Sequence, residues 1–93
     1  MIRSFRDSHT QAIFIRQRSR RFSPAVQRAA LKKLLILHAA ERLEDLIVPP
    51  GNRLEKLSGR RAGQHSIRIN DQWRVCFVWK GSDAFDVEVV DYH

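Results

Sequence analysis

The 93-residue chain carries 17 lysines and arginines against 10 aspartates and glutamates, so its formal net charge is +7 with neutral histidines. With 43% hydrophobic and 29% charged residues, its composition is globular, and its length suffices for one domain, residues 1–93, but not for two. No apolar run approaches the roughly 20 residues of a membrane span, and no signal peptide is recognisable. The single Cys76 excludes an internal disulfide or a Cys-rich zinc site. We expect a cytoplasmic protein without a cofactor and without a membrane partner.

The basic charge is concentrated in two segments. Residues 1–22 and residues 51–80 each carry a net charge of +5, whereas residues 81–93 carry −4. Thirteen of the 17 basic residues are arginines, whose forked guanidinium suits contact with phosphate. This distribution favours a polyanionic partner such as nucleic acid, although a merely soluble basic protein can have the same composition.

The N-terminal half is predicted to be mainly helical. A short strand at residues 2–5 precedes a helical turn over residues 10–16. Ser23 is a favourable N-cap and Pro24 a favourable first helical residue, and apolar residues then recur at helical spacing. We expect this helix to end near Leu46, before the Pro-Pro-Gly linker that follows.

The C-terminal half is predicted to form strands. Apolar and polar residues alternate between turn-forming residues, and the candidate strands are residues 53–57, 65–69, 73–79 and 85–92. Short connections make consecutive strands antiparallel. The predicted fold class is α+β, with two N-terminal helices packed on one face of a small twisted antiparallel sheet, in the order β-α-α-β-β-β.

Alternation along the strands also sorts the charged side chains. If Ile67 faces the helices, Arg68 faces away from them, and Arg74 on the next strand faces the same way. We expect the two arginines on one exposed sheet face, within reach of a single anion. The alternatives are a solvated pair or an internal ion pair with Glu55 or Asp91.

The histidines and the cysteine give little indication of chemistry on their own. The four histidines show no metal-ligand spacing. We expect His38 to be a packing or surface residue, His65 to be partly buried and hydrogen-bonded, and Cys76 to be a small buried side chain. The C-terminal Asp-Tyr-His, residues 91–93, combines an acid, a phenol that can stack and an imidazole that titrates near neutrality.

Three stretches of the chain, residues 52–59, 63–77 and 90–93, resemble the HigB toxins. These belong to the RelE/ParE superfamily of type II toxin–antitoxin systems, and the resemblance covers essentially the whole chain. It implies a RelE-like fold and cleavage of messenger RNA in the ribosomal A site without metal. The RNA 2′-hydroxyl would attack the adjacent phosphate and leave a 2′,3′-cyclic phosphate and a 5′-hydroxyl.

The resemblance implies roles for individual residues. Arg74 matches the arginine that steadies the scissile phosphate, and Arg68 can assist it. Tyr92 matches an aromatic residue that stacks on or orients the RNA base. His93 stands where a terminal histidine protonates the leaving 5′-oxygen, and Asp91 is expected to orient its neighbours.

Two positions depart from the HigB pattern, which has a histidine and a lysine where this chain has Glu55 and Ser58. Glu55 matches the general-base glutamate of the related YoeB branch. The missing lysine removes one cation from the phosphate site, although Lys56, Arg60 and Arg61 are close in sequence and are expected to bind RNA. Loss of one transition-state cation commonly costs about 10²–10³ in rate, so we expect a mild nuclease.

The resemblance also implies partners and leaves alternatives open. The expected partners are the ribosome, mRNA and a HigA-like helix-turn-helix antitoxin that dimerises, with operator DNA bound only through the antitoxin. One alternative function is a growth inhibitor that binds the ribosome or ribosomal RNA without cutting. The other is a ParE-type gyrase poison, against which the tail and the surroundings of Arg74 argue because they resemble the RNase branch. The fold alone cannot separate these alternatives, since one scaffold hosts unrelated functions.

Overall fold

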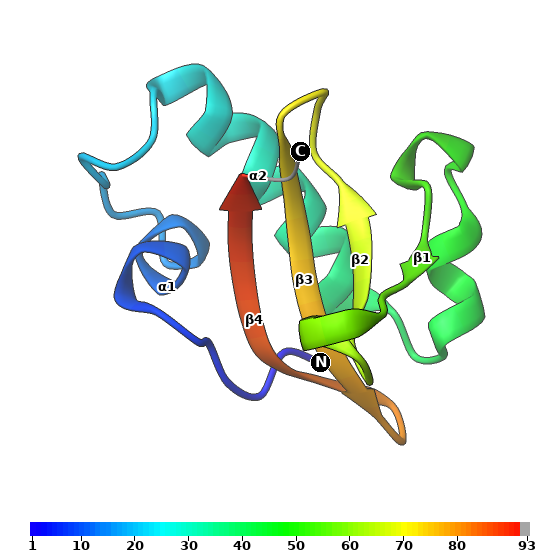
Figure 1. The fold of residues 1–93 in the computed structure, drawn as a ribbon. Coiled ribbons are helices and arrows are strands. Elements are labelled where there is room, and N and C mark those ends of the chain that lie inside the picture. Colours follow the sequence, from blue (N-terminus) through cyan, green and yellow to red (C-terminus); the bar gives the residue numbers. More distant parts are fainter. Residues whose placement is uncertain (92–93) are drawn as a thin grey trace.

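A four-stranded antiparallel sheet with strand order β1-β2-β3-β4 forms the centre of the molecule (Figure 1). The computed structural model describes residues 1–91. The strands are β1 (Glu55–Lys56), β2 (His65–Arg68), β3 (Trp73–Lys80) and β4 (Asp83–Asp91). The helices are α1 (Ser8–Phe14) and α2 (Pro24–Ala39), and the short 3₁₀ turns are η1 (Leu43–Ile47), η2 (Pro50–Asn52) and η3 (Gly59–Arg61). The predicted α+β class is confirmed.

Helix α2 lies behind the sheet in Figure 1, and its start follows the sequence signal. The Ser23 hydroxyl accepts a hydrogen bond from the Val26 amide at 3.2 Å, and Pro24 is the first helical residue. Residues at helical spacing are buried against the sheet, namely Ala30, Leu34 and Leu37. Burying each leucine contributes about 1.5–3 kcal/mol, so packing on the sheet holds the helix in place.

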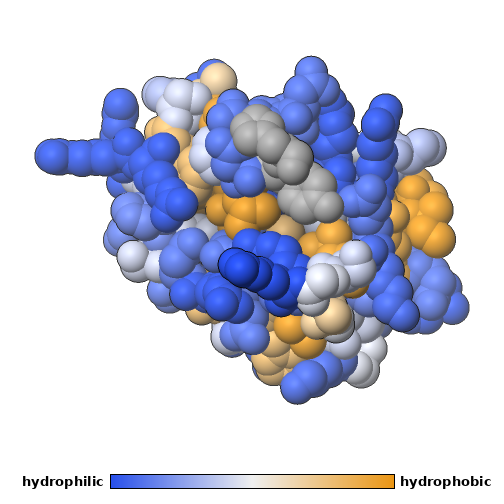
Figure 2. All heavy atoms as spheres, viewed as in Figure 1, coloured by the Kyte–Doolittle hydropathy of each residue, from blue (hydrophilic) through white to orange (hydrophobic). Residues whose placement is uncertain are grey.

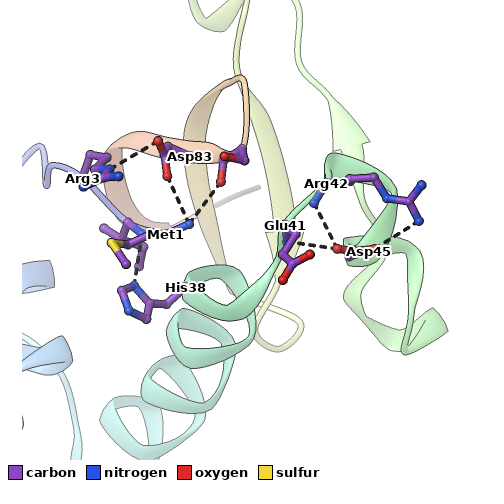
Figure 3. Close-up of polar contacts among 9 residues, drawn as sticks. Met1, Arg3, His38, Glu41, Arg42, Asp45 and Asp83 are labelled. Carbon is purple, nitrogen blue, oxygen red and sulfur yellow. Dashed lines mark hydrogen bonds and ion pairs between the residues drawn. The ribbon is translucent and has the colours of Figure 1, made fainter.

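The predicted end of this helix near Leu46 is wrong, because α2 ends at Ala39. The Asp45 carboxylate accepts hydrogen bonds from the Glu41 and Arg42 amides, each at 3.0 Å (Figure 3). These amides are therefore bonded to a side chain and not to the carbonyls one turn earlier in the helix. The chain turns there and continues into η1, whose Leu46 is still fully buried.

The predicted opening strand at residues 2–5 is reduced to two isolated contacts with β4. Ile2 pairs with Ala84 and Phe5 pairs with Val87, both in parallel orientation. The Arg3 amide donates to the Ala84 carbonyl and the Arg6 amide to the Val87 carbonyl, but the two bridges do not join into a continuous ladder. The four strands that do form are all C-terminal, since the candidate at residues 53–57 is the short strand β1.

The start of the chain is nevertheless firmly attached (Figure 3). The Met1 ammonium and the Arg3 guanidinium lie 3.4 and 3.3 Å from the Asp83 carboxylate. The Ile2 amide donates to Nδ1 of His38 at 3.1 Å, and the His38 ring packs on Phe14. His38 is therefore a packing residue, as predicted.

The hydrophobic core lies between the sheet and the two helices. Its fully buried side chains come from α1, from α2 and from the helix-facing positions of the strands, and they include Ile13, Leu34, Leu37, Ile67, Val75 and Phe77. Ile67 lies in this core, as its expected orientation toward the helices requires. Within residues 1–91 no helix has the length and hydropathy needed to cross a bilayer.

Candidate active site

Arg74 on β3 is the most firmly held charged residue of the sheet. Its side chain is only 10% exposed. Nε donates to the Ser66 hydroxyl at 2.8 Å, and Nη2 donates to the Arg53 carbonyl at 2.7 Å. Nη2 also lies 3.6 Å from the carboxylate of Glu55. Hydrogen bonds to Ser66 and Arg53 and an ion pair with Glu55 therefore fix the plane of this guanidinium.

The strand register brings these residues together. Ser66 on β2 lies opposite Glu55 on β1 and opposite Cys76 on β3. Arg74 is two residues before Cys76, so it faces the same side of the sheet. Arg53, just before β1, has a left-handed backbone with φ 45°, which is uncommon for a residue with a side chain. The hydrogen bond from Arg74 to its carbonyl stabilises that turn.

Glu55 is the accessible member of the pair. Its side chain is 52% exposed, whereas its partner Arg74 is almost fully buried. The two-residue strand β1 pairs on one side only, with β2, so Glu55 stands at the edge of the sheet. A carboxylate in this position can accept a proton from a bound hydroxyl while the adjacent guanidinium offsets charge on a phosphate.

The face of the sheet that points away from the helices is more covered than the sequence suggests. The turn η3 lies in front of β3, where it is drawn in yellow-green in Figure 1. From η3 the Arg61 guanidinium lies 3.1 Å from the Glu88 carboxylate on β4. Cys76 on β3 is fully buried, as predicted. Figure 2 shows that the surface seen from this side is largely hydrophilic.

The prediction that two arginines lie together on an exposed sheet face is therefore wrong. Arg68 and Arg74 are direct partners across β2 and β3, as expected. Arg74 is buried against Ser66 and Glu55, and Arg68 is ion-paired with Asp71 in the turn after β2. The alternative of an internal ion pair with Glu55 holds for Arg74, because a buried guanidinium needs protein partners once water is excluded. The partner of Arg68, Asp71, was not among the predicted ones.

The other predicted cations differ in their accessibility. Lys56 on β1 and Arg60 on η3 are exposed. Arg61 is half-buried, and it donates to the Gln64 side chain at 3.1 Å in addition to its ion pair with Glu88. Lys56 and Arg60 can thus contact a polyanion at the edge of the site, whereas Arg61 is engaged within the protein.

The described end of β4 pairs with the start of β3. Asp91, the last residue of β4, lies opposite Trp73, and its carboxylate accepts a hydrogen bond from the Gln72 side chain at 3.1 Å. Val90 lies opposite Arg74, so the end of β4 runs beside the held guanidinium. The predicted site residues Tyr92 and His93 lie outside the described residues.

Ser66 is a site residue that the sequence reasoning missed. Its side chain is fully buried, and it is the hydrogen-bond acceptor that orients Nε of Arg74. A signal was available, because Ser66 is two residues before Arg68 in an alternating strand and therefore shares its face. A larger side chain at this position would occupy the space of the guanidinium.

His65 faces away from the Arg74 side and stacks on Phe77, with ring centroids 6.2 Å apart. Within residues 1–91, its Nδ1 is buried without a hydrogen-bond partner. Burial, with the charge of Lys56 as a second cause, lowers the pKa of His65 below its ordinary value of 6.5. His65 is thus partly buried, as predicted, but within residues 1–91 the expected hydrogen bond is missing at Nδ1, and the ring packs on Phe77.

The lowered pKa of His65 makes stability depend on pH. The unfolded chain takes up a proton near pH 6.5, whereas the folded protein takes it up only at lower pH. We therefore expect the free energy of unfolding to fall as pH drops below about 6.5, with this fall reduced in His65→Gln. Urea unfolding of the wild type and of His65→Gln at pH 7.5 and pH 5.5 measures this difference. If both proteins lost the same free energy of unfolding between the two pH values, His65 would not be the group responsible.

No group of three histidine, cysteine, aspartate or glutamate side chains that could hold a metal ion occurs in residues 1–91. The arrangement centred on Glu55 and Arg74 instead provides a proton acceptor beside a fixed cation. Those are two of the groups that phosphodiester transesterification requires.

Comparisons relate the chain to known proteins. A family model described as a RelE-like toxin of type II toxin–antitoxin system HigB matches residues 3–93. Toxin HigB-1 of Vibrio cholerae serotype O1 is 39% identical over 80 residues, which span 85% of this chain and 84% of that toxin. An uncharacterized protein of Haemophilus influenzae is 34% identical over 53 residues, or 57% of this chain and 52% of the relative.

Proposed function

The chain belongs to the RelE-like HigB toxins of type II toxin–antitoxin systems, and from that premise we propose that it inhibits translation by cutting messenger RNA on the ribosome without a metal ion. The observation that carries the proposal is the pair formed by Glu55 and Arg74. A half-exposed carboxylate stands 3.6 Å from a guanidinium that two further protein groups hold in place.

In the proposed reaction, the 2′-oxygen of one nucleotide forms a bond to the adjacent phosphorus, and its proton moves to the Glu55 carboxylate. The bond from phosphorus to the 5′-oxygen of the next nucleotide breaks, and that oxygen takes a proton from His93. The products are a 2′,3′-cyclic phosphate and a 5′-hydroxyl. Arg74 offsets the charge that develops on the phosphate oxygens, because a fixed cation needs no reorganisation during the reaction.

The remaining site residues are proposed to hold the RNA. Lys56 and Arg60 are exposed near Glu55 in sequence and suit contacts with the RNA backbone. Tyr92 is assigned to stacking on a base, and Asp91 to orienting the chain end. Arg68, paired with Asp71, has at most an assisting role. Because Ser58 stands where HigB toxins have a lysine, we expect the cleavage to be slow.

A toxin of this class acts together with an antitoxin. We propose that the partner is a dimeric HigA-like helix-turn-helix protein, and that operator DNA is bound only through it. The other proposed partners are the ribosome and its mRNA, which place the activity in the cytoplasm.

Removal of His93 tests the proposal in a translating system. Purified protein, intact or lacking His93, is added to ribosomes that translate a defined message, and primer extension maps new ends. We expect cuts at the A site with the intact protein and none with the truncated one, because the leaving oxygen has lost its acid. The thermal midpoint is expected to stay within about 2 °C, since one terminal residue contributes little to stability.

Other outcomes separate the alternative functions. Arrested translation without cuts would indicate a protein that binds the ribosome or its RNA and does not cleave. Unaffected translation combined with inhibited gyrase supercoiling would indicate a ParE-type poison. Cleavage that survives truncation would remove His93 from the mechanism.

A further inference from the structure

A pocket of about 290 Å³ lies on the opposite side of the molecule from β1, between the end of α1, the connection over residues 15–22 and the start of α2. The proposed cleavage reaction uses none of its residues. Apolar side chains from all three segments line it, among them Ile13, Phe22 and Leu31. It has room for one large apolar side chain.

Three arginines, Arg16, Arg18 and Arg28, also line the pocket, and among the described residues no aspartate or glutamate does. All three are exposed. In the described part of the chain, none of them forms an ion pair with a carboxylate. The pocket thus presents an apolar interior surrounded by positive charge, which is complementary to an apolar residue flanked by acidic ones.

The pocket is held open by contacts within the protein. The Gln27 side chain of α2 donates to the Gln17 carbonyl at 2.7 Å and accepts from the Ser19 amide at 3.1 Å. These bonds attach the connecting segment to the helix. On the inner side, Phe22 packs edge-on against Trp73 of β3, with centroids 5.2 Å apart. A preformed pocket binds a partner without the entropic cost of ordering its own walls.

The surface beside the pocket favours a protein over a nucleic acid as its occupant. Leu35 lies one helical turn after Leu31 on the same side of α2 and is 40% exposed. This leucine extends the apolar lining beyond the pocket. A polypeptide can cover such a strip with a second apolar side chain, whereas a phosphodiester backbone offers it only charge.

We infer that the pocket receives an apolar side chain from an acidic segment of the antitoxin. This inference rests on the proposed function for the existence of that partner and adds where and by what chemistry it binds. The apolar side chain enters between α1 and α2, its acidic neighbours contact the three arginines, and a further apolar residue covers Leu35.

The test compares two charge-reversal variants of the full chain that change the net charge equally. The pocket variant carries Arg18→Glu and Arg28→Glu. The control variant carries Arg20→Glu and Lys32→Glu, which are exposed positions in the same segment and helix that do not line the pocket. The probe is the purified antitoxin encoded with the toxin, and calorimetric titration gives its dissociation constant at low and high salt.

The pocket variant is expected to bind the antitoxin about 100-fold more weakly, and the control no more than about threefold more weakly. High salt should reduce the difference, because part of it is Coulombic. The neutral pair Arg18→Gln and Arg28→Gln should lose about tenfold. Both charge-reversal variants should keep the wild-type thermal midpoint, since all four side chains are exposed.

Equal weakening by both charge-reversal variants, or no weakening by either, would overturn the inference and leave the proposed partner intact. So would a pocket variant that binds the antitoxin normally but no longer pellets with ribosomes, because the occupant would then be RNA. If the wild-type protein itself failed to bind the antitoxin, the proposed partner would be wrong as well, and the inference would fall with it.

Discussion

Replacing Arg74 with lysine is expected to lower the rate of mRNA cleavage about 100- to 1,000-fold, although the positive charge is kept. One ammonium group cannot reach the Ser66 hydroxyl, the Arg53 carbonyl and the Glu55 carboxylate in the plane that the guanidinium occupies. The free energy of unfolding should fall by about 1–3 kcal/mol, because buried polar groups lose a partner. Single-turnover cleavage on programmed ribosomes and urea unfolding measure the two effects.

Two further variants separate positioning from folding. Ser66→Ala removes only the hydroxyl that accepts from Nε of Arg74 and should lower cleavage in the same direction, by about tenfold. Arg20→Lys, at an exposed position remote from the site, should change neither quantity. If Arg74→Lys cleaved at the wild-type rate while folded, the guanidinium would have only a structural role.

Replacing Glu55 with glutamine is expected to lower cleavage about 100- to 10,000-fold with little effect on stability. An amide of the same size cannot take up the proton of the 2′-hydroxyl. The side chain is 52% exposed, so the loss of its ion pair with Arg74 should cost no more than about 1 kcal/mol. Primer extension over a time course gives the rate, and thermal melting gives the stability.

Glu44→Gln provides the matched control, because Glu44 is an exposed glutamate on η1 and away from the sheet. It should cleave like the wild-type protein. Wild-type cleavage by Glu55→Gln would mean that another group accepts the proton. A folded but inactive Glu55→Gln that still associates with ribosomes would support the proposed role.

Helix α2 shows which helix boundaries the local sequence can predict. The start of α2 could be predicted, because Ser23 and Pro24 act within one turn of the chain. Its end could not, because the first proline or glycine after Ala39 is Pro49, ten residues later. The helix stops where the Asp45 side chain reaches back to two amides, which is a contact that spacing alone does not reveal.

For the site, the sequence predicts which side of the sheet a residue faces but not whether that residue is buried. Alternation placed Arg74 and Arg68 on the correct side of the sheet, because the period of a strand is two. It could not predict that Arg74 is buried, since its guanidinium is held by the Arg53 carbonyl and the Glu55 carboxylate, which are distant from it in the sequence. Glu55 was found through the family resemblance, and only the strand register shows that it meets Arg74.

The most direct test of the account is the chemistry of the RNA ends. Ribosomes are first loaded with a defined message and then incubated with the wild-type protein or with Glu55→Gln. The ends of the cut RNA fragments are identified by mass spectrometry. The proposed mechanism predicts a 2′,3′-cyclic phosphate and a 5′-hydroxyl from the wild type, and about 100-fold or more less cleavage by Glu55→Gln in the same time. Fragments with a 3′-hydroxyl and a 5′-phosphate would contradict it, because their formation requires an attacking water and not the 2′-oxygen of the RNA.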